Sequence, residues 1–68
     1  MTVFGKRLKE LRTEKNKSQQ QLGLEINYSQ QVISNWESGN VEPTASAIVA
    51  VADYFGVSTD YLLGKKDF

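Results

Sequence analysis

The sequence predicts an all-α domain of five short helices. Apolar residues recur at spacings of three and four, and a Ser or Thr suited to a helix N-cap precedes each such run. No segment alternates polar and apolar residues as a half-buried strand would. A chain of 68 residues has room for one domain, so we expect residues 1–68 to fold as a single unit.

The first two predicted helices are separated by a short loop. The first begins after Thr2 and ends near Asn16, and the residues at helical spacing along it are Phe4, Leu8, Leu11 and Lys15. Ser18 and Gln21 form a capping-box pair that starts the second helix. Asn27 suits a tight turn after it, because Asn tolerates the left-handed conformation. The inward residues of the second helix are Leu22 and Ile26.

The third predicted helix, residues 29–36, has two chemically different sides. Ser29 caps its start, and Gly39 provides the C-terminal cap. The apolar side carries Val32, Ile33 and Trp36, so we expect Trp36 in the core rather than stacked on a base. The opposite side carries neutral hydrogen-bonding residues, namely Gln30, Gln31, Ser34, Asn35 and Ser38.

Two further helices complete the predicted domain. Thr44 caps the fourth, Gly56 ends it, and its inward residues are Ile48, Val51, Ala52 and Phe55. Ser58 caps a short fifth helix, which Gly64 ends and which contains Tyr61, Leu62 and Leu63.

The composition excludes several classes of function. The chain has no Cys and no His, so disulfides, thiolate or imidazole metal ligands and His-based catalysis are absent. Its acidic residues are scattered along the sequence, so we expect no enzyme, no metal and no cofactor. We find neither a secretory signal pattern nor an apolar run long enough to span a membrane, and we expect a soluble cytoplasmic protein.

Charge is unevenly distributed along the chain, although the formal net charge is zero. Residues 1–17 contain six Lys or Arg and two Glu, whereas residues 18–64 contain no Lys or Arg and five Asp or Glu. Contact with nucleic-acid phosphates normally requires basic residues. A DNA-binding surface on this protein must therefore draw its positive charge from the first helix.

The second and third helices, joined by a tight turn, form a predicted helix-turn-helix. Gln and Asn side chains donate and accept hydrogen bonds at once, and so match the N6 and N7 edge of adenine in the major groove. A merely polar surface is the alternative explanation, but an ordinary solvated helix face usually carries Lys, Glu and Arg. The amide-rich side of residues 29–36 therefore favours base reading in double-stranded DNA.

Four segments carry a resemblance to a known family: FGKRLKELR, SQQQL, SQQVISNWESG and EPTASAIVAVADYFGVSTDYLLG. In register over residues 4–64, they resemble the Cro/CI-type helix-turn-helix (XRE) family, which includes lambdoid phage repressors. The resemblance implies a lambda-repressor-like five-helix bundle with its core in residues 4–64, and a DNA-binding transcriptional regulator. It also indicates a phage or mobile-element origin.

The resemblance further implies roles for individual residues. The family's base-reading positions fall on Gln30, Gln31 and Asn35, with secondary contacts at Ser34 and Ser29. Its phosphate-contacting positions fall on Gln19, Ser38 and Asn40. A structural ion pair that ties the first helix to the end of the third is implied between Arg12 and Glu37.

Three features depart from the family pattern. Asn40 and Val41 stand where members often have Lys or Arg, so phosphate neutralisation should be weak. Gly23 replaces a usual alanine, at an intrinsic cost of about 0.8 to 1 kcal/mol unless close helix packing requires it. Leu24 lies where a polar residue is usual, either as a partner contact or, as is more common, as a single exposed leucine.

From these observations we predict a sequence-specific DNA-binding regulator, a repressor that occupies its operator. The set Tyr54, Tyr61, Leu62 and Leu63 exceeds the needs of a small core, so we expect part of it to form a homodimer interface for an inverted-repeat operator. The alternative is a protein-interaction module, antitoxin-like or a co-regulator domain, which the neutral recognition face favours. The absence of a broad apolar stripe on the third helix argues against that alternative.

Overall fold

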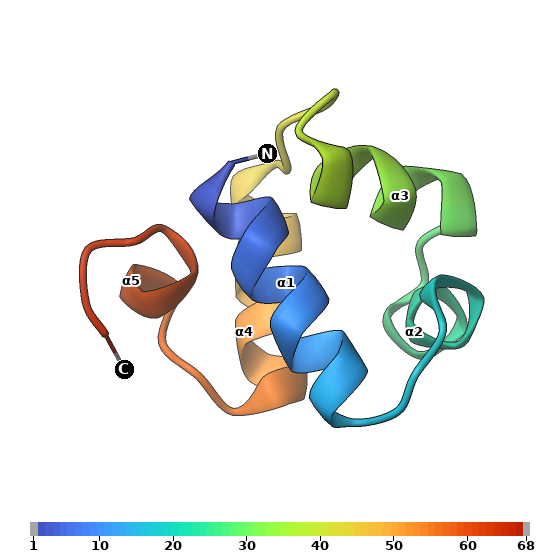
Figure 1. Ribbon diagram of the computed structural model, residues 1–68, viewed down its shortest axis with the longest axis horizontal. Helices are drawn as coiled ribbons and strands as arrows, with labels where there is room; N and C mark the ends of the chain where they lie inside the picture. Colours follow the sequence, from blue (N-terminus) through green and yellow to red (C-terminus); the bar gives the residue numbers. More distant parts are fainter. Residues whose placement is uncertain (1, 68) are drawn as a thin grey trace.

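The computed structural model describes residues 2–67, which form five helices and no strand. These are α1 (Val3–Glu14), α2 (Gln19–Ile26), α3 (Gln30–Ser38), α4 (Ala45–Phe55) and α5 (Thr59–Leu62). In Figure 1, α1 crosses the middle of the bundle, with α2 and α3 on one side, α5 on the other and α4 behind. The predicted all-α fold is confirmed. Within residues 2–67, no helix has the length and apolar character needed to span a bilayer.

Each helix begins at the Ser or Thr that the sequence predicts as its cap. The side-chain oxygen of the cap residue accepts a hydrogen bond from the backbone N–H three residues ahead, which satisfies a donor that the helix leaves unpaired. The capping box of α2 is complete, because Gln21 Oε1 accepts from the Ser18 N–H at 2.8 Å. The third helix extends to Ser38 instead of Trp36, since the left-handed residue that closes it is Gly39, at φ 85°.

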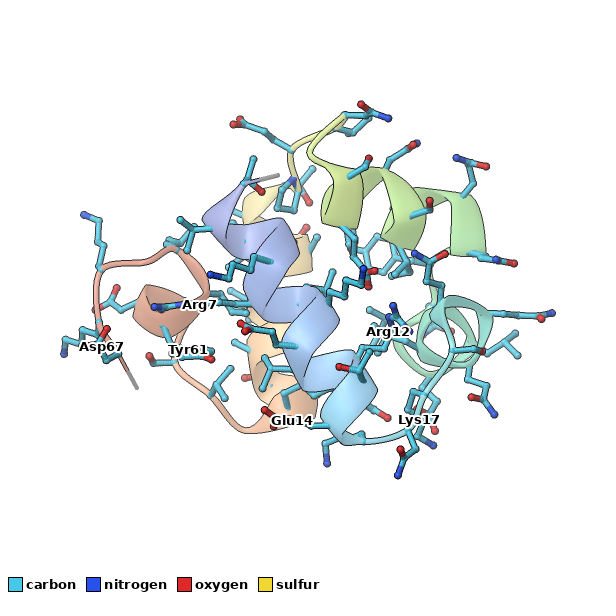
Figure 2. The ribbon with its side chains drawn as sticks, in the orientation of Figure 1. Arg7, Arg12, Glu14, Lys17, Tyr61 and Asp67 are labelled. Atoms are coloured by element: carbon cyan, nitrogen blue, oxygen red, sulfur yellow. The ribbon has the colours of Figure 1, made fainter. Side chains whose placement is uncertain are left out.

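Arg7 fastens α5 and the segment after it to α1. Its guanidinium donates to the backbone carbonyl of Tyr61 and, at 2.7 Å, to that of Lys66. Its Cζ atom lies 4.3 Å from the centre of the Tyr61 ring, a cation–π contact, and the two side chains lie together in Figure 2. Residues 7 and 61 are far apart in the sequence, and no local pattern predicts this contact.

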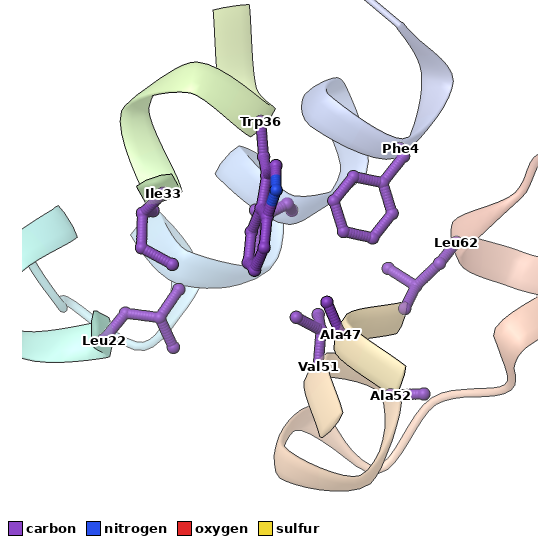
Figure 3. Close-up of a cluster of buried hydrophobic side chains, with 9 residues drawn as sticks. Phe4, Leu22, Ile33, Trp36, Ala47, Val51, Ala52 and Leu62 are labelled. Carbon is purple, nitrogen blue, oxygen red and sulfur yellow. The ribbon is translucent and has the colours of Figure 1, made fainter. Parts of the chain in front are cut away.

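Trp36 lies at the centre of the hydrophobic core, among residues from all five helices (Figure 3). Its ring meets Phe4 edge-to-face at a centroid distance of 6.1 Å and Tyr28 at 4.8 Å. The predicted core position of Trp36 is confirmed. The buried apolar residues are Phe4, Leu8, Leu22, Ile33, Trp36, Ala47, Val51, Ala52 and Leu62.

Two glycines allow backbone segments to approach closely. A Cβ atom on Gly5 would lie 2.4 Å from the carbonyl oxygen of Trp36, so α1 and α3 cross here with no side chain between them. A Cβ atom on Gly23 would lie 2.3 Å from the carbonyl oxygen of Tyr28, where the chain turns from α2 to α3. Close packing therefore accounts for Gly23, whose intrinsic helix propensity is poor.

One member of the expected dimer-forming set is not available to a partner. Leu62 is fully buried and belongs to the core, so the part of the set that could face a second copy does not include it. Its helix is a single turn, and Leu62 is the residue of that turn which points into the bundle (Figure 3). Leu63 is 46% exposed, and Tyr54 and Tyr61 are half-buried.

A cluster around Glu25 joins α2 to α4 at the surface. Lys17 Nζ lies 3.1 Å from Glu25 Oε1, and the Tyr54 hydroxyl donates to Glu25 Oε2. The hydrogen bond from Tyr54, followed by that from Lys17, lowers the pKa of Glu25 below its ordinary value of 4.5. The same bond to Glu25 raises the pKa of Tyr54 above 10.0, because it favours the protonated phenol.

These pKa shifts predict how the free energy of unfolding depends on pH. The folded-state pKa of Glu25 is lowered, so its contribution is present above pH 4.5 and is lost as the pH falls through the folded-state value. Tyr54 has a raised folded-state pKa, so its contribution is present below pH 10.0 and is lost as the pH rises through that value.

The loss of the Glu25 contribution in acid is tested by urea unfolding of the wild type and of Glu25→Gln at about pH 7 and about pH 3. We expect Glu25→Gln to be less stable at neutral pH and the difference to shrink in acid. Glu14→Gln, which removes an exposed α1 carboxylate, is the control. An equal stability difference for Glu25→Gln at both pH values would show that the cluster makes no ionic contribution.

Candidate nucleic-acid interface

A side-chain hydrogen-bond network links the three helices that form the candidate interface, and its members are Arg12, Glu37 and Gln19. Arg12 on α1 donates from Nε to Glu37 Oε2 at 2.7 Å and from a terminal nitrogen to Oε1 at 3.0 Å. Gln19, the first residue of α2, donates to the same Oε1 at 3.1 Å. The structure thus contains the ion pair implied by the resemblance, in the bidentate geometry that makes Arg–carboxylate pairs strong.

This ion pair is largely shielded from solvent. The side chains of Arg12 and Glu37 are 12% and 5% exposed. Arg12 also donates to the backbone carbonyl of Lys17 at 2.9 Å, which holds the loop between α1 and α2. Throughout residues 2–67, every buried side-chain nitrogen or oxygen has a hydrogen-bond partner. The network is therefore complete, and the loss of one member would leave a buried charge unpaired.

The turn between α2 and α3 sets the direction of α3. Asn27 adopts the left-handed conformation expected for it, at φ 65°, and the Tyr28 N–H donates to the carbonyl of Gly23 at 2.9 Å. The Tyr28 ring then packs against Trp36, and the Ser29 hydroxyl caps the new helix. A three-residue turn anchored at both ends gives a rigid helix-turn-helix.

The expected base-reading residues lie together on one side of α3. Gln30 and Gln31 are exposed in its first turn, and Asn35 is half-buried one turn later. Gln31 Nε2 donates to Asn35 Oδ1 at 3.2 Å, so the two amides form a unit. Figure 2 shows polar side chains projecting from the side of α3 that faces away from α1. Ser34 is half-buried, and Ser29 remains exposed while capping the helix.

The expected phosphate-contacting residues are only partly brought together. Gln19 and Ser38 line one hollow of about 230 Å³, together with Lys9, Ser34 and Glu37. Asn40 is exposed in the segment after α3 and does not line that hollow. The Ser38 hydroxyl donates to the Asn35 carbonyl at 3.1 Å and accepts from the Asn40 N–H at 3.4 Å.

Lys9 is a residue of this surface that the sequence analysis missed. It lies three positions before Arg12, so the two side chains share one side of α1. Since Arg12 was already expected to face α3, this spacing is the signal that would have identified Lys9. No cluster of three or more carboxylates suited to a metal ion occurs within residues 2–67.

A profile of the helix-turn-helix family matches residues 8–62. The chain belongs to the helix-turn-helix family. It is of the Cro/CI (XRE) type that the sequence resemblance implies. The predicted family, a helix-turn-helix domain, is confirmed with it.

Three curated regulators with this helix-turn-helix are similar in sequence. The transcriptional activator BcrR of Enterococcus faecalis is 36% identical over 64 residues, which are 94% of this chain and 31% of BcrR. ImmR of Bacillus subtilis (strain 168) is 35% identical over 64 residues, 94% of this chain and 50% of ImmR. The SPbeta prophage-derived regulator YonR of the same strain is 38% identical over 61 residues, which are 90% of this chain and 56% of YonR. This chain therefore spans between 31% and 56% of the length of these relatives.

A solved helix-turn-helix protein has the same fold. The P22 c2 repressor, crystallised with a synthetic operator, superposes with a TM-score of 0.87 at 29% sequence identity. The match covers 97% of this chain and 100% of the repressor chain. The lambda-repressor-like bundle expected from the sequence is therefore confirmed.

Glu37→Gln tests whether the ion pair holds the helix-turn-helix against α1. Removing one partner of a shielded pair leaves the Arg12 guanidinium without its counter-charge, so we expect a loss of about 3 kcal/mol and a Tm lower by roughly 10 to 20 °C. Thermal unfolding followed by circular dichroism measures both. Glu42→Gln, an exposed carboxylate in the loop after α3, should change Tm little. Equal Tm values for the two variants would contradict the structural role of Glu37.

Proposed function

We propose that residues 1–68 form one helix-turn-helix domain, with its core in residues 4–64, that reads an operator with the first turn of α3 in the major groove. The observation that carries this proposal is the pair Gln30 and Gln31, exposed side by side at the start of a helix whose direction is fixed. A Gln amide donates and accepts simultaneously and pairs with adenine N6 and N7. Adenines are therefore the bases we expect opposite these two residues.

The other polar residues take supporting roles in this proposal. Asn35 reads bases jointly with Gln31, because their hydrogen bond orients both amides before DNA arrives. Ser29 and Ser34 make secondary base contacts at the edge of the same surface. Phosphates are contacted by Gln19, Ser38 and Asn40, which fix the register of the domain on the duplex.

We further propose that the domain represses transcription by occupying its operator in the cytoplasm. Support comes from the c2 repressor, which was solved in complex with a synthetic operator. BcrR, a relative in sequence, is by contrast a transcriptional activator. A phage or mobile-element origin agrees with the prophage-derived relative YonR.

A homodimer on an inverted repeat completes the proposal. An apolar groove of about 350 Å³ lies between the start of α1, the loop before α4, and α5. Val3 and Leu63 border it and are 48% and 46% exposed, which makes them candidates for burial against a second copy. Two copies related by a two-fold axis would then contact half-sites roughly 34 Å apart.

The base-reading role is tested by selection from random duplexes, followed by fluorescence anisotropy on the enriched sequence. We expect an adenine-containing inverted repeat to be enriched. Gln31→Ala should weaken binding by about 1 to 3 kcal/mol and relax the preference at a particular base position of each half-site. Gln20→Ala, an exposed glutamine on α2 outside the α3 surface, is the matched control and should leave base preference unchanged.

A uniform loss of affinity across all sequences for Gln31→Ala would show that Gln31 does not read bases.

If no duplex is enriched even at low salt, the domain is a protein-interaction module instead. Two observations favour that alternative: residues 18–64 contain no Lys or Arg, and Leu24 on α2 is 74% exposed. The search would then move to protein partners.

The dimer is tested with Leu63→Glu, which places a charge at the border of the apolar groove. We expect this variant to bind an isolated half-site as the wild type does and to lose the additional affinity for the full inverted repeat, as measured by anisotropy and sedimentation. Val49→Glu, at an α4 position 49% exposed and outside the groove, is the control. Unchanged binding to the full repeat would place the dimer contact elsewhere.

A further inference from the structure

We infer that the hollow between α1, α2 and α3 binds one phosphate of the DNA backbone and that Lys9 supplies the positive charge there. The inference rests on the proposed DNA binding and assigns a residue that neither the sequence pattern nor the family resemblance singled out. The hollow is lined by Lys9, Gln19, Ser34, Glu37 and Ser38.

The distribution of cations over the protein points to Lys9. Residues 18–64 contain no Lys or Arg, so α2, α3 and α4 contribute no positive side chain to the interface. On α1, Arg7 is held against Tyr61 and Arg12 is held by Glu37. Lys9 forms no ion pair with a described carboxylate and is exposed beside α3. It is the lysine that lines a hollow next to the base-reading surface.

Glu37 also lines the hollow, and its negative charge must be accounted for. Both of its carboxylate oxygens are engaged, Oε2 with Arg12 and Oε1 with Arg12 and Gln19. The charges of Arg12 and Glu37 offset one another at 2.7 Å, so the charge left over in the hollow is that of Lys9. An anion entering it therefore meets a positive site rather than a bare carboxylate.

The remaining lining groups suit a phosphodiester oxygen. Ser34 brings a hydroxyl to the wall of the hollow, and the Gln19 amide has a second hydrogen beyond the one donated to Glu37, so both can donate to a phosphate oxygen. The Ser38 hydroxyl already donates to the Asn35 carbonyl. Ser34 also belongs to the α3 side that carries the base-reading residues. A phosphate in the hollow would consequently lie at the edge of the groove that α3 enters. Contacts to phosphate at such a point position the helix without reading sequence.

The test measures how the affinity for the selected duplex depends on salt. Each phosphate neutralised adds roughly 0.9 to the slope of log K against log salt. Lys9→Gln should reduce the slope by about one per protomer and weaken selected and unrelated duplexes by the same factor. Lys6→Gln, an exposed α1 lysine outside the hollow, is the matched control, and Lys9→Arg should retain the wild-type slope.

A methylphosphonate scan of the operator identifies the phosphate itself. We expect one neutral linkage in each half-site to weaken the wild type severalfold and to weaken Lys9→Gln by a clearly smaller factor, since the ionic contact is already lost in that variant. Equal slopes for Lys9→Gln and Lys6→Gln, with the wild type binding DNA, would overturn this inference alone. A wild type that binds no duplex at any salt concentration would overturn both the proposed function and this inference.

Discussion

The buried carboxylate of Glu37 is the constraint on which the interface depends. A charge removed from water must be paired, and Arg12 from α1 and Gln19 from α2 provide the pairing. Arg12 and Gln19 come from different helices. Pairing the Glu37 carboxylate, near the end of α3, therefore fixes how α1, α2 and α3 lie relative to one another. The orientation of α3 therefore depends on this ion pair in addition to the apolar contacts of Trp36.

Local features were predictable from the sequence because their causes are local. Ser18 with Gln21 and the left-handed Asn27 act within a few residues of themselves, and the structure agrees with the sequence at each. The contact of Arg7 with Tyr61, the close crossing at Gly5 and the burial of Leu62 depend on chain segments far apart in sequence. Helical periodicity identifies which side of a helix is apolar, but a single-turn helix such as α5 has too few residues to show it.

The same division between local and long-range features applies to the candidate site. Helical spacing placed the amide side chains on the outer side of α3 and the family resemblance implied their roles; the structure shows Gln30 and Gln31 exposed there. Lys9 was overlooked because a lysine on a helix surface is ordinary, and only the packing of α1 beside α3 makes this one distinctive. With so few cations on these helices, the proposed complex would gain little affinity from the phosphate backbone and a larger share from base edges.

The hydrogen bond between Gln31 and Asn35 has a consequence for how such an interface evolves. Because the two amides orient each other, a substitution at either changes the geometry that the other offers. Under the proposed base reading, the bases opposite them would not be recognised independently, and an additive table of base preferences would describe this part of an operator poorly. In such a complex, a change of base preference at this point would require substitutions at both residues, so single substitutions would reduce binding before a second one could restore it.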